Sequence, residues 1–215
     1  MPVTTRVAIN GFGRIGRGFL RASLNNPNIE VVAVNDLTPP ETNAHLLKYD
    51  STQGRLDLEV SVSAEGIKVG NKTIKVLAER SPENLPWGDL KIDVVIESTG
   101  LFTTREKASA HLKAGAKRVI ISAPGTDVDA TFVYGVNHST FDANSHFIVS
   151  NASCTPSLKS NLIYPIRCPT DGVHLIKTTP IASQKTVKFT VKDGKDSIKV
   201  PLVFADMKKP RELTS

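Results

Sequence analysis

The chain has 215 residues, of which 40% are hydrophobic and 22% charged, and its formal net charge at pH 7 is +6. This composition excludes a disordered or fibrous chain, and the two cysteines exclude a disulfide framework or a zinc site, so no bound metal is expected. Without a bilayer-length apolar run, a signal peptide or a basic patch interleaved with aromatic residues, we expect a cytoplasmic protein with anionic ligands, no membrane partner and no nucleic acid.

The first predicted element is an apolar strand over residues 6–9, which runs into a glycine turn and then a helix over 14–24. The turn has the pattern G-x-G-x-x-G, formed by Gly11, Gly13 and Gly16. In such a turn the first glycine permits a tight bend, the second lets the backbone approach a pyrophosphate, and the third lets helix and strand pack closely. The helix would point its free N–H groups at the phosphates. Since glycine turns that bind nothing are common, the motif needs support from its context.

A second buried strand, predicted over residues 29–34, supplies that context. It ends at Asp36, which lies 20 residues after Gly16. A carboxylate at this place can accept hydrogen bonds from a ribose 2′-hydroxyl and repel a 2′-phosphate. The sequence therefore predicts a dinucleotide site that favours NAD over NADP.

The following residues predict a short helix over 41–49, with Ala44, Leu46 and Leu47 facing inward. From Leu56 to Leu77 the hydrophobic period changes to two, with turn residues at 65–66 and 70–71, which indicates antiparallel hairpins. Together with the alternating strands and helices around them, these residues predict a doubly wound α/β (Rossmann) fold. Its sheet would be mostly parallel, with an antiparallel hairpin insertion.

The parallel pattern resumes with predicted strands over 94–96, 118–121, 132–136 and 147–149. A capping box of Thr103 and Glu106 opens a helix between the first two, and Gly115 closes it. Small polar residues follow two of these strands, at 98–100 and 122–124. Open α/β sheets bind their ligands at this carboxyl edge, although small residues there are also ordinary loop formers.

Cys154 is the best candidate nucleophile. It follows a predicted strand and precedes a predicted helix, whose first turn suits Pro156. A thiol at a helix N-terminus is more readily ionised and more reactive, whereas a lone cysteine is more often an inert, buried residue. A thiolate that attacks an aldehyde gives a hemithioacetal, which can pass a hydride to a nicotinamide and leave a thioester.

Residues 6 to about 155 resemble the N-terminal, NAD-binding part of the glyceraldehyde-3-phosphate dehydrogenase family. The resemblance is carried by residues 9–17, 35–37, 47–51, 85–87, 97–102, 111–117, 121–124 and 150–155. Members of this family are phosphorylating, NAD-dependent, cytoplasmic enzymes of glycolysis, and usually tetramers.

The resemblance implies a role for each matching residue. Asp36 would hold the adenosine ribose and Arg80 the adenine region, while Cys154 would be the catalytic nucleophile between the substrate-binding residues Ser153 and Thr155. The other cofactor-binding residues would be Asn10, Gly11, Phe12, Gly13, Arg14, Ile15 and Gly16 around the pyrophosphate, and Thr99, Gly100 and Ser122 near the nicotinamide ribose.

The family pattern breaks after Thr155. Residues 178–187 form a second stretch that resembles the family, but this stretch lacks the histidine that serves the family as general base. In addition, no arginine matches the one that binds the substrate phosphate in the family. His174 is the nearest replacement base, although its apolar surroundings favour a surface or core histidine. We therefore predict a NAD-binding domain over 1–152, followed over 153–215 by a truncated, divergent remnant of the catalytic domain with a short β segment.

Three functions follow from the resemblance. The first is a phosphorylating aldehyde dehydrogenase that transfers a hydride to NAD and uses a phosphorylated aldehyde and inorganic phosphate. The second, within the same class, acts on erythrose 4-phosphate. The third is a truncated or degenerate relative that binds NAD with little or no turnover, so whether the chain is an enzyme stays open. The family's contact loop between subunits has no counterpart in the sequence, so the family's homo-oligomer is not expected here.

Overall fold

A computed structural model describes residues 4–134 and 136–152, and beyond them the backbone of four strands. The chain divides into two compact units, Met1–Cys154 and Thr155–Ser215, and each is considered by itself. The predicted domains, 1–152 for NAD binding and 153–215 as a remnant of a catalytic domain, remain predictions.

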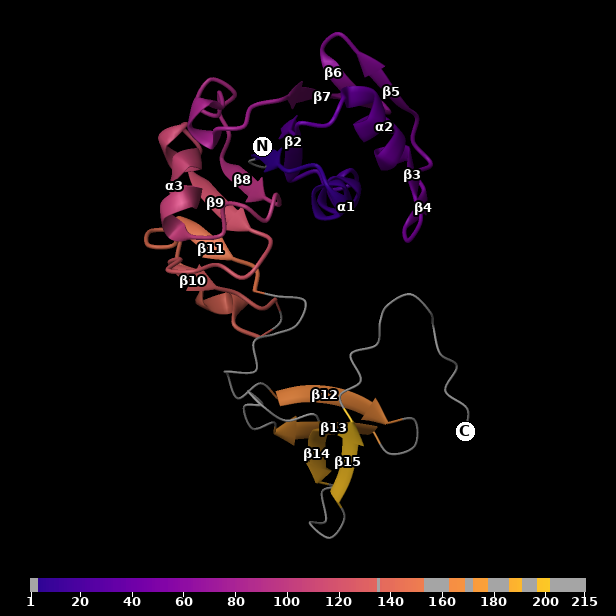
Figure 1. Cartoon of the computed structure of the whole chain (residues 1–215), viewed down its shortest axis with the longest axis vertical. Helices are drawn as coiled ribbons and strands as arrows, with labels where there is room; N and C mark the ends of the chain where they lie inside the picture. The colour runs from indigo at the N-terminus through magenta and orange to yellow at the C-terminus, as the bar shows by residue number, and fades with distance from the viewer. Residues whose placement is uncertain are drawn as a thin grey trace. The chain divides into compact units, whose positions relative to one another are not determined.

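The first unit contains a mixed sheet with helices on both of its faces (Figure 1). Its elements are β1 (Thr5–Asn10), α1 (Arg14–Ser23), β2 (Ile29–Asn35), α2 (Pro40–Lys48), β3 (Tyr49–Asp50), β4 (Gly54–Arg55), β5 (Val60–Ser63), β6 (Gly66–Val69), β7 (Lys72–Leu77), η1 (Pro82–Asn84), β8 (Val94–Glu97), α3 (Arg105–Lys113), β9 (Arg118–Ile121), β10 (Ala130–Thr131), η2 (His138–Thr140) and β11 (Ile148–Ser150).

The sheet has nine strands in the order β10-β11-β9-β8-β1-β2-β7-β6-β5. From β10 to β7 all neighbours are parallel, whereas β5, β6 and β7 pair antiparallel. The chain leaves β1 toward β2 on one side and returns to β8 on the other. The gap between β1 and β8 is therefore the topological switch point, at which open α/β sheets bind ligands.

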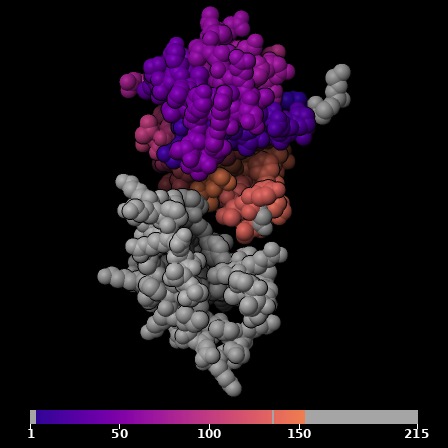
Figure 2. Space-filling model, turned by 90° about the vertical axis from the view of Figure 1, so that its right-hand side faces the viewer, coloured from indigo at the N-terminus to yellow at the C-terminus, as the bar shows by residue number. Residues whose placement is uncertain are grey.

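Strand side chains alternate between two cores, one on each face. On one face Ile9 and Ile96 pack with Leu20 of α1 and Leu47 of α2. On the other face Ala8 and Val95 pack with the segment before β8, which includes Trp87, and Val119 and Ile121 of β9 pack with Ala108 of α3. Figure 2 shows the side of the first unit on which α2 and the hairpin strands lie, in purple. The sheet order and the two cores confirm the predicted doubly wound fold with a hairpin insertion.

Four local predictions were wrong. Leu46, expected inward on α2, is 38% exposed. The strand expected over 132–136 is instead the two-residue β10, which ends at Thr131. The expected cap Thr103 lies outside α3, because Thr104 is the N-cap and its hydroxyl accepts from Lys107 N at 3.3 Å. The period-two segment begins pairing only at Val60 of β5. At α3 the predicted end shifted because a polar residue one position along makes the cap.

The second unit contains two antiparallel strand pairs. The first joins β12 (Ile163–Cys168) to β13 (Gly172–Lys177), and the second joins β14 (Thr186–Thr190) to β15 (Ser197–Pro201). Both lie within the part of the chain for which a short β segment is predicted. The helix expected after Cys154 lies outside the described residues.

Candidate functional site

Three neighbouring parallel strands end in polar residues that share one face of the sheet. Asn10 ends β1, Asn35 ends β2 and Glu97 ends β8, and Asn10 pairs in register with both of the others. All three side chains are at least 95% buried. Since buried polar groups need partners, these strand ends must form a hydrogen-bond network at the switch point.

The glycine turn follows directly from β1. Gly11 has a φ of +90°, and a Cβ atom there would stand 2.6 Å from the backbone nitrogen of Thr99. A Cβ on Gly16 would overlap the carbonyl oxygen of Gly11. Because glycine has no Cβ, α1 can lie directly against the turn. Gly13 differs from both, because nothing lies within 4 Å of a Cβ built there. The space beside Gly13 is open, and no side chain caps the N-terminus of α1 at this residue.

The backbone of Phe12 holds the turn from two sides. Its N–H donates to Asp36 Oδ2 at 2.7 Å, and its carbonyl accepts from Arg17 Nη1 at 2.8 Å. The other carboxylate oxygen of Asp36 accepts from Thr38 N at 2.8 Å. Burial alone would raise the pKa of Asp36, but hydrogen bonds from Thr38 and Phe12 and the charge of Arg17 outweigh it and hold the pKa below its ordinary value. Asp36 is therefore an anion near neutral pH, with acceptor capacity left for a ligand.

A cleft of about 470 Å³ lies over these strand ends. It is lined by Asn10, Gly11, Gly13, Asn35, Asp36, Leu37, Glu79, Arg80, Ser98, Thr99, Leu101 and Phe102. Its walls combine exposed apolar surface, such as Leu37 and Leu101, with polar groups. This mixture is typical of small-molecule sites.

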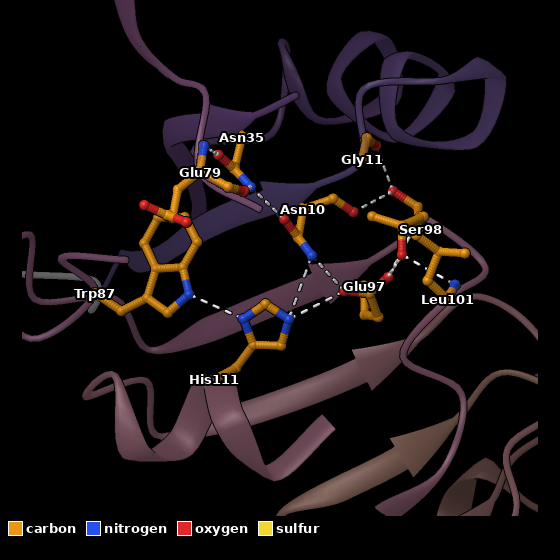
Figure 3. A network of polar contacts seen from close by, with 10 residues as sticks. Asn10, Gly11, Asn35, Glu79, Trp87, Glu97, Ser98, Leu101 and His111 are labelled. Atoms are coloured by element: carbon orange, nitrogen blue, oxygen red, sulfur yellow. Dashed lines mark hydrogen bonds and ion pairs between the residues drawn. The ribbon is translucent and has the colours of Figure 1, made fainter. Parts of the chain in front are cut away.

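Beneath the cleft lies the network that the strand ends require (Figure 3). Asn35 donates to Asn10 Oδ1 at 2.7 Å, and Asn10 donates to Glu97 Oε2 at 2.6 Å. Glu97 Oε2 also contacts His111 Nε2 at 3.0 Å, and the indole N–H of Trp87 donates to His111 Nδ1 at 3.0 Å. The second carboxylate oxygen of Glu97 accepts from the backbone and the hydroxyl of Thr99. The buried carboxylate is thereby linked to a residue that lines the cleft.

The structure brings together about half of the predicted cofactor residues. Six of them line the cleft: Asn10, Gly11, Gly13, Asp36, Arg80 and Thr99. Phe12 contributes its backbone while its ring lies in the core, and Arg14 and Ile15 are exposed on the first turn of α1. Gly16 packs against the turn, and Gly100 and Ser122 are not part of the cleft lining.

Several residues of this site were not recognised from the sequence as functional. The sequence indicated them only as members of the longer segments that resemble the family: Asn35, Trp87, Glu97 and His111. The signal that could have found Asn35 and Glu97 is the pattern of apolar strands that each end in an amide or carboxylate at the same edge of the sheet, whereas no such pattern marks Trp87 and His111.

The residues predicted for catalysis lie outside the described part of the chain, since Ser153, Cys154 and Thr155 follow its last fully described residue, Ala152. The segment that leads to them is anchored by Ser150. Its hydroxyl donates to Ala123 O at 2.7 Å and accepts from the backbone nitrogens of Gly125 and Ala152. For His174 the structure gives only its place in β13, opposite Ile166.

Within residues 4–134 and 136–152, no group of three or more His, Cys, Asp or Glu side chains is placed to hold a metal ion. Among the helices that the structure describes, none is long and apolar enough to span a membrane.

The sheet order, the glycine turn at the switch point and the carboxylate after β2 define the class of the first unit, a doubly wound dinucleotide-binding domain. Comparison with known families shows which kind of dinucleotide-binding domain the first unit resembles. Residues 5–105 match the family described as glyceraldehyde 3-phosphate dehydrogenase, NAD binding domain. This part of the chain is therefore similar to the NAD-binding domain of the glyceraldehyde-3-phosphate dehydrogenase family, and the match supports NAD as the cofactor.

Curated relatives agree with this assignment. The chain is 60% identical over 153 residues to a glyceraldehyde-3-phosphate dehydrogenase of Geobacillus stearothermophilus, covering 71% of the chain and 46% of that protein. It is 56% identical over 164 residues to glyceraldehyde-3-phosphate dehydrogenase 2 of Trichormus variabilis. With the plasmid-encoded enzyme of Cupriavidus necator the identity is 52% over 181 residues, which covers 82% of this chain and 54% of the relative. The chain thus spans about half the length of the curated relatives it matches.

Proposed function

We propose that NAD binds in the cleft at the β1–β8 switch point and that the chain acts as an aldehyde dehydrogenase through Cys154. The observation that carries the binding proposal is the meeting of Gly13, Asp36 and Thr99 in one cleft, although they follow three different strands. The residues fit a dinucleotide. A Cβ on Gly13 would point into open space that a pyrophosphate needs, and the uncapped first turn of α1 offers N–H donors to an anion.

Each part of the cleft has a role in this proposal. Asp36, anionic and fixed by Phe12 and Thr38, accepts from the adenosine ribose hydroxyls and repels a 2′-phosphate. Leu37 and Arg80 lie beside the adenine, and Thr99 lies at the nicotinamide ribose. The positive end of α1, together with Arg14, favours the phosphates. When bound, NAD supplies the hydride acceptor.

The chemistry would be performed by Cys154. Its thiolate attacks the aldehyde carbon of a phosphorylated substrate, and the carbonyl oxygen takes a proton from the protonated base and becomes the hydroxyl of a hemithioacetal. Loss of that hydroxyl proton to a base and of a hydride from carbon leaves a thioester, which inorganic phosphate then cleaves to an acyl phosphate while the thiolate returns. The base is His174 or a residue not yet identified. Glyceraldehyde 3-phosphate is the first substrate to test and erythrose 4-phosphate the second.

A second candidate is NAD binding with little or no turnover. The observation that favours it is the sequence Thr178-Thr179-Pro180-Ile181, which has no histidine where the family motif carries its general base. A positioned general base typically contributes about 10²–10⁴-fold to a rate. A chain without one would bind cofactor normally and oxidise aldehydes slowly.

One pair of measurements distinguishes the two candidates. Purified chain is titrated with NAD by calorimetry, and NADH formation is followed with each aldehyde in the presence of phosphate. Binding together with Cys154-dependent NADH formation supports the dehydrogenase. Binding without NADH formation supports the second candidate, and absence of NAD binding contradicts both.

A further inference from the structure

The buried residues beneath the cleft carry an inference about how cofactor binding is organised. Trp87 and His111 are fully buried and Glu97 is 1% exposed. None of the three lines the cleft. Even so, hydrogen bonds lead from the Trp87 indole through His111 to Glu97 (Figure 3). Glu97 in turn accepts from Thr99, which lines the cleft.

The donor and acceptor roles in this chain are fixed at one end by Trp87. An indole nitrogen can only donate, so His111 Nδ1 must accept. An imidazole that accepts at Nδ1 is neutral and carries its proton on Nε2, 3.0 Å from Glu97 Oε2. His111 is therefore a neutral donor to Glu97, and the two do not form an ion pair.

The other end is fixed by the backbone of Glu79. Its N–H donates to Asn35 Oδ1 at 2.8 Å and its carbonyl accepts from Asn35 Nδ2 at 2.8 Å, which determines the orientation of that amide. Asn35 Nδ2 also donates to Asn10 Oδ1, so Asn10 must direct its Nδ2 at Glu97. Two independent ends therefore require Glu97 Oε2 to accept.

Glu97 consequently has no group to which it could give a proton. Its four contacts are with Asn10 Nδ2, His111 Nε2, and the backbone nitrogen and hydroxyl of Thr99. The first three are donors by the arguments above or by their chemistry. The Thr99 hydroxyl must then be the fourth donor, with its proton turned inward. Its oxygen already accepts from Leu101 N at 3.1 Å, which leaves one lone pair for the cleft.

We propose that Trp87, His111 and Glu97 are positioning residues for the cofactor: by holding the Thr99 proton inward, they make the Thr99 hydroxyl a pure acceptor for a ligand hydroxyl. The inference rests on the proposed binding of NAD in this cleft. A ribose hydroxyl is the matching donor, and a ligand group that can only accept would be rejected at this point of the wall.

A double-mutant cycle on the full chain tests the proposal. Thr99→Val removes the acceptor, and Glu97→Gln removes the group that orients it. We expect each to weaken NAD binding by about tenfold in calorimetry, the loss of one well-placed hydrogen bond to a desolvated group. The double variant should bind no more weakly than the weaker single variant, because both changes remove the same interaction.

Asp129→Asn is the matched control. The Asp129 side chain is 10% exposed and its carboxylate accepts from the backbone nitrogens of Phe147 and Ile148, away from the cleft. This variant should lower Tm, leave NAD affinity unchanged and show no coupling to Thr99→Val. Independent, additive losses for Glu97→Gln and Thr99→Val would overturn the inference while leaving NAD binding intact. A wild-type chain that does not bind NAD would overturn the proposed function and this inference with it.

A measurement on the wild-type chain avoids any dependence on the folding of variants. Nitrogen-15 NMR of the histidine side chains distinguishes a neutral imidazole protonated at Nε2 from the other tautomer and from the imidazolium. At pH 7 His111 should be the neutral Nε2–H form. An imidazolium, or a proton on Nδ1, would break the chain of donors and overturn the proposal whether or not NAD binds.

Discussion

The backbone N–H of Phe12 donates to Asp36 Oδ2 at 2.7 Å, which ties the glycine turn after β1 to the residue that follows β2. One carboxylate thereby holds the turn in shape and, in the proposed binding mode, also accepts from the adenosine ribose. Binding and local stability should respond together when Asp36 is changed.

The first prediction concerns acid stability. The pKa of Asp36 is lowered in the folded chain, so its ionised form contributes stability above the ordinary pKa of 3.8, and the contribution is lost as the pH falls through the lower folded value. Asp36→Asn should therefore be less stable than wild type at pH 7, and the difference should shrink below about pH 4. Urea unfolding at pH 7, 5, 4 and 3 measures it, and a difference that grows on acidification would contradict the assignment.

The second prediction concerns the choice between NAD and NADP, which depends on the charge of Asp36. Its carboxylate repels a 2′-phosphate, so the wild-type chain should bind NAD more tightly than NADP, and Asp36→Asn should narrow the ratio of the two dissociation constants. Calorimetry with both cofactors measures the ratio. The control is Asp93→Asn, because Asp93 also has a lowered pKa but its partners are Lys117 and Arg6, and its side chain is not in the cleft lining. An unchanged ratio in Asp36→Asn would place the adenosine ribose elsewhere.

Gly16 and Gly13 should differ in their effect on stability. A Cβ on Gly16 meets the Gly11 carbonyl and the Ile9 side chain, whereas one on Gly13 meets nothing within 4 Å. Gly16→Ala should therefore lower the free energy of unfolding by about 1–3 kcal/mol, the usual cost of overpacking. Gly13→Ala should change it by less than about 0.5 kcal/mol, as at other uncrowded sites. Equal losses in denaturant titrations would contradict this account of the turn.

The doubly wound fold could be predicted from the sequence because its signals are local. Apolar strands such as residues 29–34, the glycine turn after β1 and the turn residues between the hairpin strands each specify their own geometry. Boundaries were less accurate, as with Thr103 and Thr104, since neighbouring residues of similar capping ability compete and tertiary contacts decide.

The site could be predicted only in part, for the same physical reason. Asp36 and the glycines have a fixed spacing along the chain, so a sequence pattern reveals them. Glu97 and His111 are 14 residues apart, and Trp87 joins them from the segment before β8. Their partnership depends on how α3 packs on the sheet, and no spacing rule encodes that packing.

The catalytic proposal predicts that Cys154→Ser abolishes NADH formation from glyceraldehyde 3-phosphate and leaves NAD affinity unchanged, because a serine hydroxyl is far less nucleophilic than a thiolate. Parallel absorbance and calorimetric measurements on the wild-type and variant chains give both quantities. Turnover that persists in the serine variant would show that another residue attacks the aldehyde.

The central claim, that NAD occupies the cleft beside the glycine turn, is tested most directly by calorimetric titration of Gly13→Ala with NAD. The added methyl group projects into space that is empty in the protein and that the pyrophosphate would fill. The account predicts an unchanged Tm without cofactor and NAD binding weakened by at least about tenfold, or about 1.4 kcal/mol. Wild-type affinity in Gly13→Ala would contradict it.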